Sequence, residues 1–369
     1  MELRDRWGET RKLLGRTLGV KFPLADWIDE HEDCHYHLGS SGMAGSIRHP
    51  LPTSVQVRKA SPEELRDRLA RHLRVDPQRV FLTAGATEAN TSILLYLARH
   101  GDAKSRKCRF HYPEYPPLFA SANGVGWLPT DSTAPAGLAV ISRPRNPEGR
   151  LDTTADLERW SEGARHLLVD ETFREFSGAP SIATLDWPRT WITGSFTKFF
   201  AGDDLRVGFL VAPQGERVPF AHFQGLLFDS LAQYSLAGAI ECLRDFPRIR
   251  RDVLRVFTAN LAALAEAFPG TSPPRAPVYF DRVPGVDGPT VAQRCLEASV
   301  LVCPGSMFGD PSGVRLGLTR RTFPRDLAAY LKVRRQLEAD RFTEGARESR
   351  SAAARRPHGE TDRNSAACG

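Results

Sequence analysis

A single lysine between two expected strands constrains this chain more than any other feature. An apolar run over residues 190–193 leads to Ser195 and Lys198, and Arg206 precedes a second apolar run over 207–211. Aromatic and small residues surround the lysine, and desolvation of this kind disfavours its charged form. A neutral amine near the anion-binding side chains of Ser195 and Arg206 suits a Schiff base with a phosphorylated aldehyde. A solvated lysine on a loop is the alternative, so the choice depends on the other motifs.

The turn at residues 85–87 is a candidate anion site. Residues 80–84 are typical of a strand, and a helix is expected over 88–99. A turn of small residues at a helix N-terminus presents free N–H groups and the positive end of the helix dipole. Gly85, Ala86 and Thr87 could therefore bind an anion, although any strand-to-helix connection can use such a turn.

Three further candidates follow expected strands, which cover residues 107–111, 139–142 and 166–169. Tyr115 and Asn146 come after the first two strands, and Asp170 directly follows the third. Open α/β sheets bind ligands at the carboxyl ends of their strands, and an aromatic ring can stack on a flat ligand. A loop tyrosine, a turn asparagine and a helix-capping aspartate are the structural alternatives.

The spacing of Ser195, Lys198 and Arg206, with offsets of three and eight residues, resembles the lysine segment of fold-type-I pyridoxal 5′-phosphate (PLP) enzymes. Within that group the chain is most similar to class I/II aminotransferases, such as aspartate and histidinol-phosphate aminotransferases, and the other motifs follow in the same order. The resemblance covers about residues 20–340. It implies an α/β fold, with a mostly parallel seven-stranded sheet in a large domain and a smaller α+β domain. It also implies PLP as cofactor, an amino acid as substrate and a homodimer.

The resemblance assigns a role to each candidate residue. Lys198 would bind the cofactor covalently and then serve as acid and base, and Asp170 would pair with the pyridinium nitrogen so that the ring accepts electrons. Tyr115 would stack on the ring, and Asn146 would donate to its phenolic oxygen. The phosphate would be held by Gly85, Ala86, Thr87, Ser195 and Arg206. The substrate would be bound by Ser41 and Gly42, within segment 35–43, and by Arg315, whose planar fork matches an α-carboxylate.

The chain departs from the aminotransferase pattern at Phe173. The family commonly has a tyrosine there that bonds the phenolic oxygen, and a phenylalanine cannot make this bond. The cluster from Asp170 to Arg174 is similar to that of PLP enzymes acting on arginine derivatives, such as arginine oxidases and capreomycidine synthase. Segment 38–43, with its paired serines, also resembles capreomycidine synthase. We expect Arg174 itself to face solvent. The family also has a tyrosine that reaches the phosphate in a neighbouring subunit, and residues 49–59 contain no tyrosine that could match it.

These patterns predict a class I/II aminotransferase and leave two alternatives open. The first is a PLP-dependent cyclase, eliminase or oxidase acting on an arginine-like amino acid, because it also begins with removal of the Cα proton. The second is a non-catalytic PLP-binding regulator fused to a DNA-binding module. The second is disfavoured because no winged helix fits before residue 20.

Composition bounds the other classes. The 369 residues are 41% hydrophobic, enough for a sizeable core. No apolar run reaches the roughly 18 residues that a membrane span requires. Residues 1–16 are charged and lack the apolar core of a signal peptide, and the six cysteines fit scattered reduced thiols, so we expect a cytoplasmic protein. The net charge of +6 is spread along the chain, so no nucleic-acid partner is expected. We also expect no metal site.

The pattern along the chain divides it into four segments. These are residues 1–44, joining the small domain and the active site; 45–245, the large PLP-binding domain; 246–342, the small C-terminal domain; and 343–369, a tail. The tail has no apolar pattern, so we expect it to be disordered. We also expect a charged helix over 1–20, one continuous helix over 220–244 and a last helix over 324–342.

Overall fold

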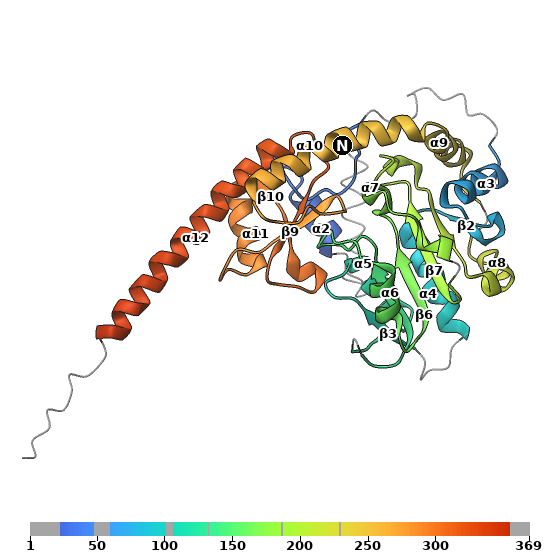
Figure 1. Cartoon of the computed structure of the whole chain (residues 1–369), viewed down its shortest axis with the longest axis horizontal. Coiled ribbons are helices and arrows are strands. Elements are labelled where there is room, and N and C mark those ends of the chain that lie inside the picture. Colours follow the sequence, from blue (N-terminus) through green and yellow to red (C-terminus); the bar gives the residue numbers. More distant parts are fainter. Residues whose placement is uncertain are drawn as a thin grey trace, which may run out of the picture.

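The computed structural model of the chain describes residues 23–47, 60–100, 106–131, 133–185, 187–228 and 230–354. The helix expected over residues 1–20, the segment 49–59 and the tail beyond residue 354 lie outside these ranges. The described residues form a larger unit built on one sheet and a smaller α+β unit beside it (Figure 1).

The larger unit is organised by a seven-stranded sheet of order β2-β8-β7-β6-β5-β3-β4. Its strands are β2 (Val80–Thr83), β3 (Lys107–Phe110), β4 (Leu128–Pro129), β5 (Ala136–Ser142), β6 (Ala164–Asp170), β7 (Thr190–Ser195) and β8 (Gly208–Val211). Strand β8 runs antiparallel to both of its neighbours, and the remaining pairs are parallel. The mostly parallel seven-stranded sheet predicted from the sequence is therefore confirmed.

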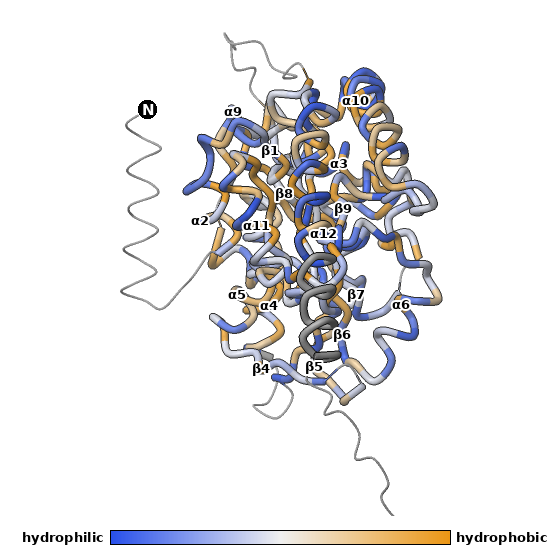
Figure 2. The backbone as a smooth tube through the Cα atoms, turned by 90° about the vertical axis from the view of Figure 1, so that its left-hand side faces the viewer, coloured by the Kyte–Doolittle hydropathy of each residue, from blue (hydrophilic) through white to orange (hydrophobic). Residues whose placement is uncertain are grey.

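Helices cover both faces of this sheet. They are α3 (Pro62–Leu73), α4 (Ala86–His100), α5 (Pro116–Gly124), α6 (Thr154–Ser161), α7 (Arg174–Ser177), α8 (Arg217–Gln224) and α9 (Gln233–Arg244), with the short 3-10 turns Pro77–Arg79, Ile182–Leu185, Asp203–Leu205 and Gln214–Glu216. Alternate residues of a strand point to opposite faces, so Leu167 and Val169 of β6 join one hydrophobic cluster while Leu168 joins the other. Burial on both faces explains the nearly continuous apolar strands, which Figure 2 shows as hydrophobic segments inside the molecule.

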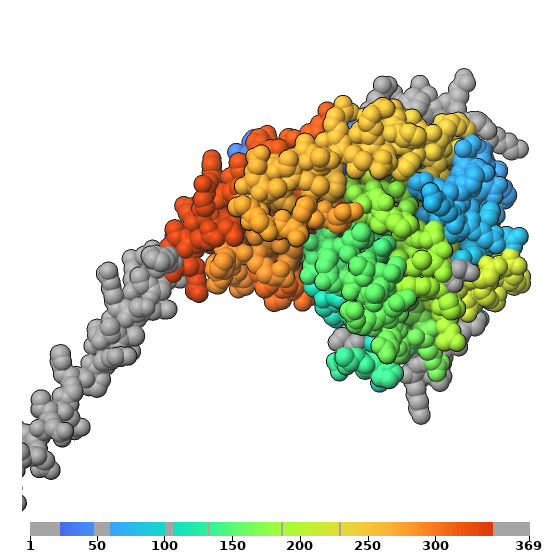
Figure 3. All heavy atoms as spheres, in the orientation of Figure 1, coloured from blue at the N-terminus to red at the C-terminus, as the bar shows by residue number. Residues whose placement is uncertain are grey.

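The smaller unit contains a three-stranded antiparallel sheet of order β11-β12-β9. Its elements are α10 (Phe246–Ala267), β9 (Val278–Asp281), α11 (Gly288–Glu297), β10 (Val300–Leu301), β11 (Cys303–Pro304), the 3-10 turn Gly305–Phe308, β12 (Val314–Gly317) and α12 (Phe323–Ala354). Strand β1 (Tyr36–His37), which follows α2 (Pro23–Glu30), pairs in parallel with β10. Helix α10 runs along both units and appears as a continuous ridge in Figure 3.

Two helix predictions differ from the structure. The single helix expected over 220–244 is wrong, because α8 ends at Gln224 and α9 begins at Gln233. Gly225 caps α8, and glycine is unfavourable inside a helix because its backbone loses more entropy there. Helix α12 continues to Ala354 instead of ending near residue 342, so the expected disorder is wrong for residues 343–354, which are helical. The residues in this extension include several Ala, Arg and Glu, which favour helix even without an apolar face.

Candidate active site

A cavity of about 1510 Å³ lies at the carboxyl ends of the central strands. The segment after β1, the N-terminus of α4 and strand β12 close it from other directions. All thirteen candidate site residues line this cavity: Ser41, Gly42, Gly85, Ala86, Thr87, Tyr115, Asn146, Asp170, Phe173, Ser195, Lys198, Arg206 and Arg315. The sequence motifs, spread over more than 270 positions, therefore meet in one place.

Asp170 occupies the last position of β6 and is 4% exposed. Its Oδ2 accepts a hydrogen bond from Asn90 Nδ2 at 3.0 Å, and its Oδ1 accepts one from the Thr172 backbone N–H at 2.9 Å. Thr193 Oγ1 donates to Asn90 Oδ1 at 2.7 Å, which fixes the orientation of the Asn90 amide. Asp170 is thus a carboxylate held rigidly toward the cavity, as required to bind a protonated ring nitrogen.

The other end of the cavity forms a cradle for an anion. The N-terminus of α4 begins at Ala86, and Gly85 before it has φ +117°, which favours glycine. A Cβ at Gly208 would lie 2.6 Å from Gly85 Cα and 2.8 Å from Ala86 N, so glycine lets β8 approach this turn. Arg206 reaches the same turn, with Nη2 3.5 Å from Ala84 O. Backbone N–H groups, a helix dipole and a guanidinium together suit a phosphate.

Ser195 ends β7 beside this cradle and is buried. Its Oγ lies 2.9 Å from Thr197 Oγ1 and accepts a hydrogen bond from the Thr197 N–H at 3.1 Å. Thr197 also lines the cavity, so two hydroxyls are presented where the sequence predicted one.

Lys198 is partly exposed to the cavity and held through its backbone, because its carbonyl accepts a hydrogen bond from Met43 N–H at 2.9 Å. Burial lowers the pKa of Lys198, the Asp203 carboxylate opposes this effect, and the charges of Arg315 and Arg206 lower the pKa further. The amine is therefore more readily neutral, and more nucleophilic, than a lysine in water.

Arg315, on β12, is 2% exposed and lines the cavity. Its Nη1 donates to Asn146 Oδ1 at 3.2 Å, and its Nη2 donates to Gly39 O at 2.8 Å. The guanidinium also lies over the Phe308 ring, 4.9 Å from its centre. Within the described residues its buried Nε has no hydrogen-bond partner. This arginine is therefore fixed in place, and its Nε–H is left without an acceptor.

The two aromatic candidates line the cavity from different elements. Tyr115 precedes α5, and its backbone N–H donates to the buried Glu114 carboxyl group at 2.7 Å. Phe173 precedes α7 and is 5% exposed, so a phenyl ring without a hydroxyl faces the site. Tyr115 offers a flat surface for stacking, and Phe173 offers dispersion but no donor.

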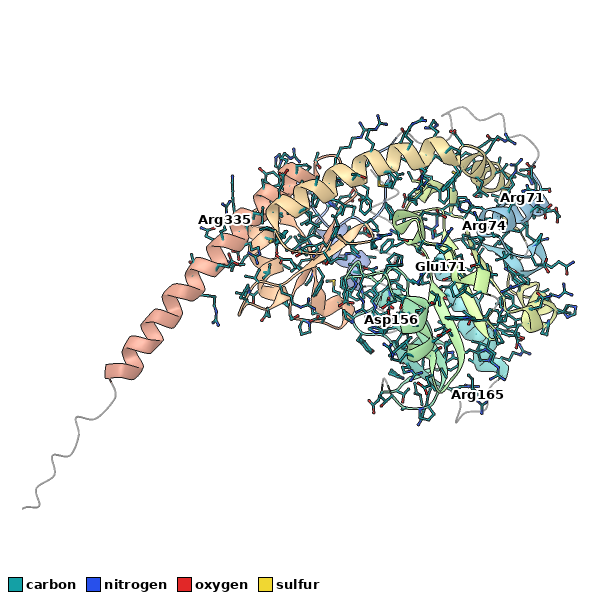
Figure 4. All side chains as sticks on the ribbon, viewed as in Figure 1. Arg71, Arg74, Asp156, Arg165, Glu171 and Arg335 are labelled. Atoms are coloured by element: carbon teal, nitrogen blue, oxygen red, sulfur yellow. The ribbon has the colours of Figure 1, made fainter. Side chains whose placement is uncertain are left out.

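The expectation that Arg174 faces solvent is wrong. Its side chain is buried, it forms an ion pair with Glu175, and its Nε lies 3.5 Å from Glu171 Oε2. Glu171 lies inside the larger unit, whereas the exposed Arg71, Arg165 and Arg335 lie far apart on the outside (Figure 4). Arg174 does not line the cavity, because the neighbouring carboxylates bind it within the core.

Sequence reasoning missed Asn90, Thr197 and Asp203. Asn90 lies in α4 next to apolar positions, and a polar residue on the buried face of a helix was the available signal. Thr197 and Asp203 flank Lys198 in the chain, and both line the cavity.

The residues described here fit PLP on structural grounds. The cradle suits its phosphate, Asp170 its ring nitrogen, Tyr115 its ring face and Lys198 its aldehyde. In the parts of the chain that the structure describes, no helix is long and apolar enough to cross a membrane. In the same parts, no group of three or more His, Cys, Asp or Glu could hold a metal ion.

Comparison with known sequences points to the same chemistry. Residues 58–322 match the sequence model of the family described as "Aminotransferase class I and II". Histidinol-phosphate aminotransferase 2 of Thiobacillus denitrificans is 27% identical over 266 residues, which are 65% of this chain and 72% of that protein. Aspartate aminotransferase of Thermococcus kodakarensis is 25% identical over 231 residues, which are 59% of this chain and 62% of that protein.

Solved structures share the fold. A PLP-dependent aminotransferase from Streptococcus suis superposes with a TM-score of 0.67 at 19% identity, covering 85% of this chain and 96% of that one. Aspartate aminotransferase from Thermus thermophilus, solved with maleate, gives a TM-score of 0.67 at 19% identity over 86% and 96% of the two chains. The chain thus belongs to the class I and II aminotransferase family and is a PLP-dependent aminotransferase.

Proposed function

We propose that the cavity residues carry out transamination of an amino acid in the roles that their positions suggest. When bound, PLP supplies an aldehyde that takes the amino group of the substrate and a ring that withdraws electrons from Cα. The observation that carries the proposal is the meeting of Lys198, Asp170 and Arg315 in one cavity.

Asp170 keeps a proton on the ring nitrogen, and Asn90 and Thr172 keep its carboxylate in place. Support comes from the hydrogen bonds that both carboxylate oxygens accept. Tyr115 provides the stacking surface. The phosphate is held by Gly85, Ala86, Thr87, Ser195 and Arg206, with Thr197 as an added hydroxyl.

Lys198 holds the cofactor and, once substrate displaces it, moves the Cα proton. Its lowered pKa supports this role, because a base must be neutral at working pH to accept a proton. The same Nζ then returns the proton at the neighbouring carbon. A single group that reaches both carbons can serve as base and then as acid.

Arg315 binds the substrate α-carboxylate, and Ser41 and Gly42 border the substrate from the segment whose Gly39 carbonyl accepts a hydrogen bond from Arg315. The buried Nε of Arg315 supports this assignment, since a carboxylate would satisfy it. Asn146 is the residue that we assign to the phenolic oxygen of the cofactor, because Phe173 has no hydroxyl to offer.

The substrate is an amino acid whose side chain we leave open, since the relatives are named for histidinol phosphate and for aspartate. Phe173 in the cavity wall favours one second candidate, a cyclase, eliminase or oxidase acting on an arginine-like amino acid. A single-turnover experiment without keto acid tests the choice, using a panel of amino acids that includes arginine. Transamination releases one 2-oxo acid per active site and then stops. Continued turnover of an arginine derivative would establish the second candidate.

We also propose a cytoplasmic homodimer with the domain limits 1–44, 45–245 and 246–342, the last of which α12 extends to Ala354. The large-sheet strands within residues 80–211 and the pairing of β1 with β10 support these limits.

Leu226, Leu227 and Tyr234 are exposed apolar residues near one another in sequence, and they support a subunit contact. The free cysteines support a reducing compartment. Sedimentation of the purified holoenzyme tests the dimer.

A further inference from the structure

Asp203 is a charged residue in the cavity to which neither the sequence motifs nor the proposed reaction gives a role. It begins the 3-10 turn Asp203–Leu205, five positions after Lys198, and it lines the cavity with that lysine. Within the described residues, its Oδ2 atom is buried and has no hydrogen-bond partner. A buried carboxylate oxygen without a partner costs free energy, so its retention calls for an explanation.

The backbone fixes where this carboxylate can be. Gly202 N–H donates to Phe196 O at 3.1 Å, and Leu205 N–H donates to Gly202 O at 3.1 Å. A Cβ at Gly202 would lie 3.0 Å from Phe196 O and 3.1 Å from Leu205 Cδ1, so the turn lies tightly against the lysine segment. The backbone of Asp203 is therefore held in a fixed position by the hydrogen bonds and close packing of this turn.

Gly42 shows that Asp203 and Lys198 border the same small space. A Cβ at Gly42 would lie 3.6 Å from Lys198 Cδ and 4.0 Å from Asp203 Oδ1. The segment that covers both residues, Gly39–Ser46, contains no ionisable side chain. It is anchored to the lysine through the hydrogen bond from Met43 N–H to Lys198 O.

Among the surrounding charges, each residue of the pair has the largest effect on the pKa of the other. Burial lowers the pKa of Lys198 and the Asp203 carboxylate raises it, while Arg315 and Arg206 lower it. Burial raises the pKa of Asp203, Lys198 lowers it, Asp204 raises it, and Arg206 lowers it. Asp203 is thus the leading charge that favours an ammonium on Lys198, against two arginines that oppose it.

We propose that Asp203 is a positioning residue that holds the ammonium form of Lys198 whenever this lysine is free of the cofactor. The proposal rests on the proposed role of Lys198. It adds that the Lys198 ammonium is held by Asp203 after the substrate has displaced the lysine from the cofactor. When the Cα–H bond of the substrate breaks, the proton forms a new N–H bond at Lys198 Nζ, and the electron pair of the broken bond remains on Cα. Asp203 stabilises the resulting ammonium without taking the proton, and the ammonium then returns that proton to the neighbouring carbon.

Asp203→Asn tests the proposal, with Asp204→Asn as the matched control. Asp204 is exposed and adjacent, so it carries the same charge without bordering the lysine space. The first readout uses the protein without cofactor, after reductive methylation with ¹³C-formaldehyde. The chain has seven lysines, and Lys198→Arg identifies the Lys198 signal in the NMR titration. We expect the pKa of Lys198 to fall in Asp203→Asn and to stay unchanged in Asp204→Asn.

The second readout is the half-reaction of the holoenzyme with its amino acid. We expect the rate constant to fall roughly ten-fold in Asp203→Asn, with KM within about three-fold of wild type. An unchanged pKa of Lys198 in Asp203→Asn would overturn the proposal. Asp203→Ser replaces Asp203→Asn if the amide variant loses its fold. Borohydride reduction of wild-type holoenzyme, followed by peptide mapping, separates the two ideas. Cofactor fixed elsewhere than Lys198 refutes the proposed function, and cofactor fixed on Lys198 with an unchanged pKa refutes the Asp203 role alone.

Discussion

The cavity has two walls that are built in different ways. We call residues from β6, β7 and the lysine turn the sheet wall, and residues from segment 38–46 and β12 the clamp wall. In the sheet wall, neighbouring strands set the positions: Asp170 pairs in register with Thr193, and Ser195 pairs with Gly208. In the clamp wall, contacts between distant segments set them.

The clamp wall depends on very close backbone contacts. Gly317 N–H donates to Leu38 O at 2.6 Å, and a Cβ at Gly317 would overlap Ser40 O and lie 2.7 Å from its carbonyl carbon. Arg321 Nε donates to Ser46 O at 2.6 Å. The difference suggests a division of labour, in which the sheet wall fixes the reactive groups and the clamp wall fixes the substrate. Substitutions should then separate chemistry from binding and stability.

Lys198→Ala should give the largest effect, because it removes the amine that holds the cofactor and moves the proton. We expect Cα–H exchange of the substrate to fall by roughly 10⁴-fold, with the fold intact. Exchange into D₂O, followed by NMR, measures this. Lys332→Ala, on the exposed side of α12, is the control and should match wild type. Exchange at the wild-type rate in Lys198→Ala would show that Lys198 does not move the Cα proton.

Asp170→Asn should come next, because an amide cannot hold a protonated ring nitrogen as a carboxylate does. We expect exchange to fall by roughly 10²-fold, equivalent to losing about 3 kcal/mol of charge-assisted hydrogen bonding. Asn90→Ala should have a smaller effect that disappears in the Asp170→Asn background, because Asn90 acts through Asp170. Additive losses in the double variant would show that Asn90 acts independently of this carboxylate.

Gly317→Ala tests the clamp wall. The added methyl must displace segment 38–42, so we expect a loss of about 1–3 kcal/mol in the free energy of unfolding. KM for the amino acid should rise while the chemical rate constant changes little, since Arg315 and Ser41 move relative to the sheet wall. Denaturant unfolding and steady-state kinetics measure the two effects. Gly215→Ala is the control, because a Cβ there meets nothing within 4 Å. A fall in rate constant with normal KM would contradict the division between the walls.

The sheet wall was more predictable from sequence than the clamp wall. Its candidates follow recognisable strands, and strand register then brings Asp170 and Ser195 to the same edge of the sheet. The pairing of Tyr36 with Val300, which joins the N-terminal segment to the smaller unit, has no local pattern to reveal it. The break between α8 and α9 was missed because Leu226, Leu227 and Leu231 continue the apolar pattern through the connection, although Gly225 was a signal for the end of a helix.

The roles of individual side chains were predictable where a sequence motif contains them. They were not predictable where residues distant in the sequence determine the surroundings of the side chain. Arg174 was expected at the surface because arginine usually is, but Glu171 and Glu175 bind it inside the unit. Asn90 and Asp203 function through the residues that they face, Asp170 and Lys198. Facing partners depend on three-dimensional packing, and the sequence gives only the spacing along the chain.

Glu114 should give the smallest effect, and it tests how rigidly the two walls are joined. This buried carboxyl accepts hydrogen bonds from Tyr115 N–H and Ser142 N–H, each at 2.7 Å, and lies 2.5 Å from Ser142 Oγ. Its own N–H donates to Phe308 O, next to Arg315. In Glu114→Gln the amide NH₂ must face one of the two backbone N–H groups, so we expect a loss of about 1 kcal/mol in stability.

The pH dependence of that loss gives the sharper test. Burial raises the pKa of Glu114 to about 8, against the hydrogen bonds from Ser142 and Tyr115, which lower it. A carboxyl with a raised pKa binds its proton more tightly in the folded state. Its contribution to stability is present below the unfolded pKa and is lost as pH rises through about 8. The stability difference between wild type and Glu114→Gln should therefore shrink as pH rises from 5 to about 8, measured by urea unfolding. Glu266→Gln, on the exposed face of α10, should show no such trend. A difference that stays constant across this range would mean that Glu114 is ionised throughout, and that the walls are joined by a buried charge instead of a neutral carboxyl.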